Sequence, residues 1–166
     1  LGVPSQAQLE VDTGLWAEGD LNSIGEKTGL WRFWNEKGLL TKASEYIDGM
    51  ISGAVKYYDG TGEIYLEIHY QNRAKNGPFF SRLEPGYYQD SRIIAERGEF
   101  KQDHAVSTWS LMDNRGRVLQ SIEYGASEHN QERLLRSAIF SNESRSTIEW
   151  EELSYRLLDS HLIGEA

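Results

Sequence analysis

A frame of glycines and bulky residues recurs along this chain about every 24 residues, and it constrains the fold more than any other sequence feature. In the clearest copy, residues 29–52, Gly29 is followed by Trp31, Gly38 and Tyr46 at offsets two, nine and seventeen. The frame restarts at Gly53, Gly77 and Ser107. A period of this length predicts a repeat architecture, in which each unit buries its apolar face against its neighbours.

Each copy predicts two strands and two turns. In the first copy the strands are residues 30–34 and 39–47, the first turn is Asn35-Glu36-Lys37-Gly38, and the second turn is residues 48–52. Asp and Asn bond their own backbone in turns, and Gly accepts a positive φ there. Short strands joined by such turns form antiparallel hairpins, so we expect a mainly β fold.

The alternation of side chains along these strands assigns two faces. One face is mostly apolar and is expected to be buried; in the first two copies it comprises Trp31, Phe33, Leu40, Ser44, Tyr46, Val55, Tyr57, Ile64, Ile68 and Tyr70. The outer face mixes charges with aromatic rings: Arg32, Trp34, Thr41, Ala43, Glu45, Lys56, Tyr58, Tyr65, Glu67 and His69. If the copies are equivalent, Trp31, Val55, Phe79 and Trp109 share one inner column.

The regions outside the regular frame are expected to differ from it. Residues 1–13 predict an extended lead-in, and the third copy carries a six-residue insertion near residues 84–92. After residue 125 the pattern becomes helical: one helix is expected from Ser127 to about Phe140, and a second begins at the capping box Ser146–Glu149. We expect these two C-terminal helices, within residues 126–166, to cap the open end of the sheet.

The frame resembles MORN repeats, and most of all the bacterial variant group that includes YwqK-type antitoxin-like proteins. The resemblance covers residues 14–125, about four and a half repeats. It is carried by Gly29, Trp31, Gly38, Tyr46, Gly49, Gly53, Tyr58, Gly62, Tyr70, Gly77, Phe79, Trp109, Gly116 and Tyr124. Three features depart from it: Ser107 replaces a glycine, the third copy has an insertion, and Asn72-Arg73 stands where Asp48-Gly49 predicts a glycine. The resemblance implies an elongated twisted antiparallel sheet of hairpins with a binding or scaffolding role, and no shared catalytic residues.

The composition excludes several functions. A net charge of −9 argues against a primary role on nucleic acid or anionic lipid, because both require a positive surface. There is no cysteine, which excludes disulfides, thiolate metal sites and a cysteine nucleophile. No apolar run reaches the ~20 residues of a membrane span, and no metal or cofactor motif is present. We expect a cytoplasmic protein that needs no cofactor, whose partner is another protein; no sequence feature indicates its oligomeric state.

One column on the outer face is the candidate binding surface. It places one cation and one aromatic ring in each of three copies: Arg32 with Trp34, Lys56 with Tyr58, and Arg82 with Phe80. Arginine and aromatic residues are enriched in protein interfaces. The alternative is that these long side chains only cover the sheet, with the cations lying over the rings.

The leading functional hypothesis is therefore a non-catalytic protein-interaction or scaffold module, antitoxin- or immunity-like by resemblance. The first alternative is a small hydrolase-like enzyme that uses His69, with Glu67 two residues away to orient the imidazole. The second alternative is binding of anionic lipid through the cationic column.

Overall fold

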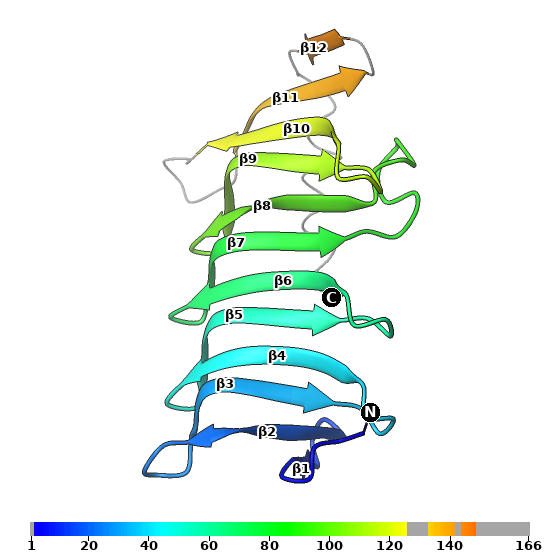
Figure 1. Cartoon of the computed structure of the whole chain (residues 1–166). Helices are drawn as coiled ribbons and strands as arrows, with labels where there is room; N and C mark the ends of the chain where they lie inside the picture. Colours follow the sequence, from blue (N-terminus) through cyan, green and yellow to red (C-terminus); the bar gives the residue numbers. More distant parts are fainter. Residues whose placement is uncertain (1, 126–132, 142–143, 149–166) are drawn as a thin grey trace. The chain divides into compact units, whose positions relative to one another are not determined.

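The computed structural model describes residues 2–125, 133–141 and 144–148, and these residues form antiparallel sheet with no helix (Figure 1). The strands are β1 Gln8–Glu10, β2 Leu15–Leu21, β3 Lys27–Trp34, β4 Leu40–Ile47, β5 Met50–Tyr58, β6 Ile64–Gln71, β7 Ala74–Arg82, β8 Ala95–Lys101, β9 His104–Met112, β10 Val118–Gly125, β11 Arg133–Ser141 and β12 Ser144–Ile148. The chain divides into two units. The first is Leu1–Ser81 with Phe100–Asp103, and the second is Arg82–Glu99 with the residues from His104 onward.

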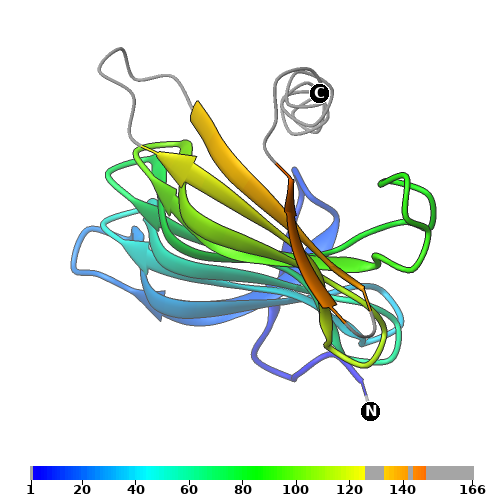
Figure 2. The ribbon, with the colours of Figure 1, turned by 90° about the horizontal axis from the view of Figure 1, so that it is seen from above.

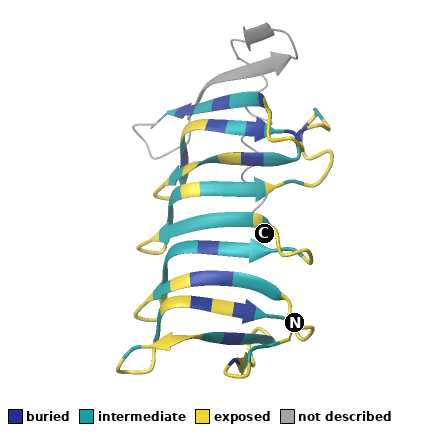
Figure 3. Ribbon diagram, viewed as in Figure 1, coloured by how far each residue is buried: buried dark blue, intermediate teal, exposed yellow. Residues whose placement is uncertain are grey.

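In the first unit, each strand from β1 to β7 pairs with the next one along the chain. The register confirms the predicted inner column for its three members in this unit, Trp31, Val55 and Phe79. Trp31 lies opposite Ser44, Ser44 opposite Val55, Val55 opposite Ile68, and Ile68 opposite Phe79. Trp31, Ser44 and Val55 are buried, and Figure 3 shows the buried positions alternating with more exposed ones along these strands.

Three lysines of the first unit place their ammonium groups over aromatic rings. The Nζ atom of Lys27 is 4.7 Å from the centroid of the Trp31 ring, and that of Lys42 is 5.0 Å from the Phe33 ring. Lys75 contacts the ring of Phe100 in the same way. Burial, followed by the charge of Lys27, lowers the pKa of Lys42. The buried face therefore combines aromatic rings with cations, where the sequence predicted a mostly apolar surface.

In the second unit, strands β9, β10, β11 and β12 pair in chain order. Trp109 lies opposite Ile122, and both are almost completely buried. A Cβ atom on Gly98 of β8 would lie only 2.1 Å from the indole of Trp109, so glycine leaves the space that the ring fills. Gly19 leaves the same space for Trp31 in the first unit, since a Cβ there would lie 2.4 Å from that indole. In both units, therefore, the tryptophan two positions after the start of a copy packs against a glycine on the preceding strand.

In the first, second and fourth copies the first turn is closed by one Asx residue, as the sequence predicted. The side-chain Oδ1 of Asp59 accepts hydrogen bonds from the backbone N–H of Thr61 and of Glu63, at 2.9 and 3.1 Å. Asn35 and Asp113 accept from the residues two and four positions later in the same way. The backbone N–H of Gly62 completes the turn by donating to the Asp59 carbonyl at 3.0 Å.

We expect the substitution Asp59→Ala to lower the free energy of unfolding by about 1 kcal/mol, because it leaves two turn N–H groups without their side-chain acceptor. Asp59→Asn is the matched control, since Asn35 makes the same bonds one repeat earlier. Urea denaturation followed by circular dichroism measures both variants. Equal stability of Asp59→Ala and wild type would show that the turn does not depend on the side chain.

The second turn of the first copy is shorter than predicted. The five-residue turn over 48–52 is wrong: only Asp48 and Gly49 form it, both at positive φ (47° and 75°), and β5 begins at Met50. Positive φ at both central residues is the type I′ geometry, whose twist matches that of the flanking strands. Asn72-Arg73 and Gln102-Asp103 form the same turn despite having no glycine.

The glycine that opens each copy lies inside a strand at a β-bulge. Gly53 has φ of 108°, and the register shifts between Ser44 and Tyr46 on the partner strand, so extra residues of β5 face β4 there. Such a φ is costly for most residues, which explains why the frame places glycine here. Ser107 occupies the equivalent position in β9 with φ of 62°, so the copy without glycine keeps the same conformation.

The expected C-terminal helices fall largely outside the described residues. Where residues 126–166 are described, the backbone forms β11 and β12, and β11 pairs with β10 from Gln120 to Gly125. The cap of two helices expected within residues 126–166 stays a prediction, because most of those residues lie outside the described part of the chain.

Candidate functional site

The predicted binding column corresponds in the first unit to one row of cross-strand partners on the outer face. In order across the sheet the row is Glu18, Arg32, Ala43, Lys56, Glu67 and Phe80. Side chains directly opposite each other in a sheet are about 5 Å apart at Cβ. The structure therefore brings Arg32, Lys56 and Phe80 into one line, but it places two carboxylates in the same line, so the row is mixed in charge and not purely cationic.

The two cations of this row have no charged, hydrogen-bonding or aromatic partner in the described part of the chain. Arg32 is exposed and Lys56 is half-buried, and neither forms an ion pair, a hydrogen bond or a ring contact with the described residues. The cation–ring contacts of the first unit lie instead on the buried face, at Lys27, Lys42 and Lys75. Neither Arg32 nor Lys56 lies over a ring of the described residues, and the alternative that these side chains only cover the sheet stays a prediction.

The remaining column residues lie elsewhere. Trp34 is opposite Trp16 and Leu40, and Tyr58 is opposite Ile64. Both are half-buried and follow a register shift at the end of their strand, so they occupy equivalent positions in successive copies. Arg82, at the end of β7, belongs to the second unit and is not part of the row.

His69 and Glu67 are neighbours on β6, as the enzyme alternative requires. The Nε2 atom of His69 is 2.9 Å from Oε1 of Glu67, and each side chain is about a quarter exposed. A carboxylate in this position can orient an imidazole. The cross-strand partners of the pair are Ala54, Lys56 and Phe80, none of which carries a hydroxyl or thiol nucleophile. The arrangement provides an oriented imidazole, and the catalytic role stays a prediction.

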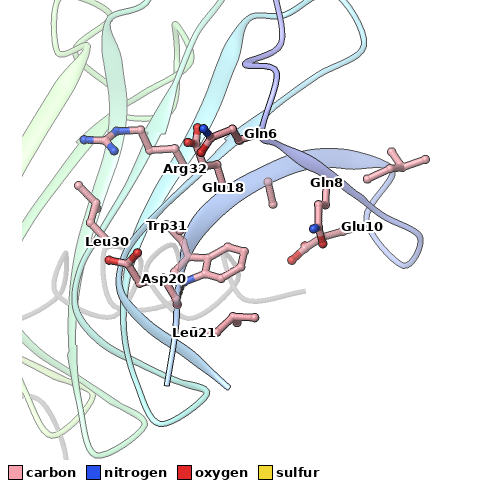
Figure 4. Close-up of a pocket in the computed structure, with 12 residues that line it drawn as sticks. Gln6, Gln8, Glu10, Glu18, Asp20, Leu21, Leu30, Trp31 and Arg32 are labelled. Atoms are coloured by element: carbon pink, nitrogen blue, oxygen red, sulfur yellow. Dashed lines mark hydrogen bonds between the residues drawn. The ribbon is translucent and has the colours of Figure 1, made fainter. Parts of the chain in front are cut away.

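A pocket of about 520 Å³ lies beside the N-terminal strands of the first unit (Figure 4). Its lining is contributed by the lead-in, β1, β2 and β3. The residues are Gln6, Gln8, Leu9, Glu10, Ala17, Glu18, Gly19, Asp20, Leu21, Leu30, Trp31 and Arg32. The indole N–H of Trp31 donates to the backbone carbonyl of Asp20 at 2.9 Å, which holds the ring in the pocket. Glu10 is already engaged in an ion pair with Lys27.

The second unit contains a buried acidic group that sequence reasoning missed. Tyr88, from the insertion, donates its hydroxyl to Oε2 of Glu96 at 2.7 Å, and both residues are buried. Burial raises the pKa of Glu96 to about 7, and the hydrogen bond from Tyr88 opposes this rise. Burial and the nearby Glu96 charge also raise the pKa of Tyr88. The hydrogen bond of this pair joins the insertion to β8.

Among the described residues, no group of three or more His, Cys, Asp or Glu side chains is arranged to hold a metal ion. No helix in the described part of the chain has the length and apolar character needed to span a membrane.

The sequence did not predict β1 or the contact between Tyr88 and Glu96, for different reasons. The alternation of residues 8–11 before the turn at residues 12–14 could have indicated β1, whereas no local pattern links Tyr88 to Glu96.

Comparison with known proteins adds no further identification. No protein-family model matches the chain, and no curated protein matches it significantly.

Proposed function

We propose that this chain is a non-catalytic protein-interaction or scaffold module built of MORN-like hairpin repeats, and that it binds a partner protein through its outer face. The observation that carries this proposal is that Arg32 and Lys56 lie in one registered row and are engaged with no described residue. Such cations stand at the ends of long side chains on the outer face of the sheet. Because they have no partner among the described residues, they are available to a second protein.

The charge pattern of the row specifies what kind of partner fits. The row places the two cations, Arg32 and Lys56, between two carboxylates, Glu18 and Glu67, and ends at Phe80. A partner surface of complementary pattern pairs with both signs and packs an apolar group on the ring. The MORN resemblance implies an antitoxin- or immunity-like role, and in that role the partner is a toxin.

The proposal is tested with the protein encoded next to this one in its genome. We expect the double variant Arg32→Glu/Lys56→Glu to reduce capture of that protein about tenfold or more in a quantitative pull-down, because two attractive contacts become repulsive. Lys37→Glu/Lys101→Glu is the control, since it makes the same change in net charge at two exposed lysines outside the row.

Unchanged capture by the row variant would contradict the assignment of this face. Binding of both wild type and control, but not the row variant, to vesicles of anionic lipid would instead favour the lipid alternative.

A further inference from the structure

The edge of β2 is only partly covered in the first unit. β1 pairs with Leu15–Ala17, whereas β2 continues to Leu21. Residues 18–21 therefore have β3 on one side and no described strand on the other, and Figure 1 shows β1 beside only the first part of β2. An unpaired strand edge presents backbone N–H and C=O groups on which another extended segment can pair.

This open edge also borders the pocket, which gives it side-chain walls. Gln6 and Gln8 stand on the β1 side with amide groups that both donate and accept hydrogen bonds (Figure 4). Leu9 and Leu21 provide apolar surface and are 52% and 57% exposed. The carbonyl of Asp20 accepts one bond from Trp31 and keeps a second lone pair. Backbone groups for pairing and pockets for alternate side chains are the two components of recognition by strand addition.

The charge of the pocket selects the ligand. Glu10, Glu18 and Asp20 line it against the single cation Arg32. The side chains of Glu18 and Asp20 form no ion pair or hydrogen bond with the described residues, whereas Glu10 is held by Lys27. Two unpaired carboxylates on alternate residues of one strand face the same side of the sheet, which suits an extended ligand with a basic side chain at a matching position.

We propose that residues 18–21 of β2 bind an extended peptide segment carrying lysine or arginine, which adds to the sheet as a further strand. The segment pairs its backbone with the open edge of β2 and places a basic side chain at Glu18 and Asp20. The edge site shares Glu18 and Arg32 with the outer-face row, but Lys56 belongs to the row alone and Asp20 to the edge site alone. Variants at Lys56 and Asp20 therefore test the two proposals separately.

The test uses fluorescein-labelled peptides of about eight residues that alternate threonine with lysine, because alternate side chains face the same way along a strand. Fluorescence anisotropy is recorded with the whole chain. We expect saturable binding of the lysine peptide, no comparable binding of its threonine–glutamate counterpart, and loss of binding when two threonines become proline, since proline removes backbone donors.

The matched variants are Asp20→Lys and Asp12→Lys, which change the net charge equally. Asp12 is exposed and lies outside the pocket lining. We expect Asp20→Lys to weaken binding of the lysine peptide about fivefold or more, and Asp12→Lys to change it less than about twofold. Asp20→Asn, which removes the charge at almost constant size, is the second variant if Asp20→Lys does not fold. Lys56→Glu is expected to leave peptide binding unchanged, which separates this site from the outer face.

Three results would overturn the proposal. They are the absence of saturable binding, equal binding of the proline-containing peptide, and equal effects of Asp12→Lys and Asp20→Lys. A concentration-dependent dimer that the lysine peptide displaces would assign the edge to a second copy of the chain instead.

Discussion

The substitution Trp109→Ala is expected to lower the free energy of unfolding by about 3–5 kcal/mol, a large part of the stability of an ordinary domain. Trp109 is 1% exposed, lies opposite Ile122 and packs its ring against Tyr124 with centroids 5.9 Å apart. Its removal leaves a cavity that the neighbouring backbone of Gly98 has no side chain to fill. Urea denaturation followed by circular dichroism measures the loss without depending on tryptophan fluorescence.

Val118→Ala is the control for Trp109→Ala. Val118 lies in the same unit, on β10, and is 38% exposed, so we expect a change of about 0.5 kcal/mol or less. A loss at Trp109 no larger than that at Val118 would mean that the indole is not part of the core. Because the same frame position holds Trp31 in the first unit, that result would also question the equivalence of the repeats.

The second large effect is a dependence of stability on pH that comes from Glu96. The folded chain raises the pKa of this carboxyl from 4.5 to about 7, mainly because Glu96 is buried. Between these values the folded state keeps a proton that the unfolded state has lost. The free energy of unfolding therefore falls as the pH rises through this range, by on the order of 3 kcal/mol, and changes little from this source above pH ~7.

Glu96→Gln removes this component, because an amide does not ionise and still accepts the hydrogen bond from Tyr88. We expect the variant to match wild type near pH 4 and to exceed its stability at pH 8, as measured by urea denaturation at a series of pH values. Glu99→Gln, at an exposed position on the same strand, is the control and should keep the wild-type slope. If Glu96→Gln declines with pH as steeply as wild type, Glu96 ionises in the folded state without penalty.

The repeat frame predicted the fold because it records contacts that recur. Gly38, Gly62 and Gly116 all have positive φ at the end of a turn closed by an Asx residue, and the aromatic positions pair across strands. Trp31 with Tyr46, Phe79 with Phe100, and Trp109 with Tyr124 each form an edge-to-face pair. The frame gave the wrong length for the second turn. Residues 50–52 were predicted as turn but belong to β5, because the two-residue type I′ turn at Asp48 and Gly49 already reverses the chain.

The candidate sites were predicted only in part. Strand alternation placed Arg32, Lys56 and Phe80 on one face, and the register places them in one row. Alternation did not place Glu18 in that row, because the lead-in lies outside the repeat frame. It did not reveal the pocket either, because the end of β1 sets where the edge of β2 becomes unpaired. Neither the burial of Glu96 nor its contact with Tyr88 follows from local pattern, since burial depends on what the insertion packs against.

The sequence by itself determined the antiparallel hairpins, their first turns, the buried column and the face that carries the cations, because these follow from backbone preferences and from alternation within a few residues. Only the tertiary structure decided which charges find partners. Lys27, Lys42 and Lys75 lie over rings while Arg32 and Lys56 do not, and Asp20 stays unpaired while Glu10 is neutralised. The physical reason is that electrostatic pairing and burial depend on distances between strands, which the register fixes and which no single segment contains.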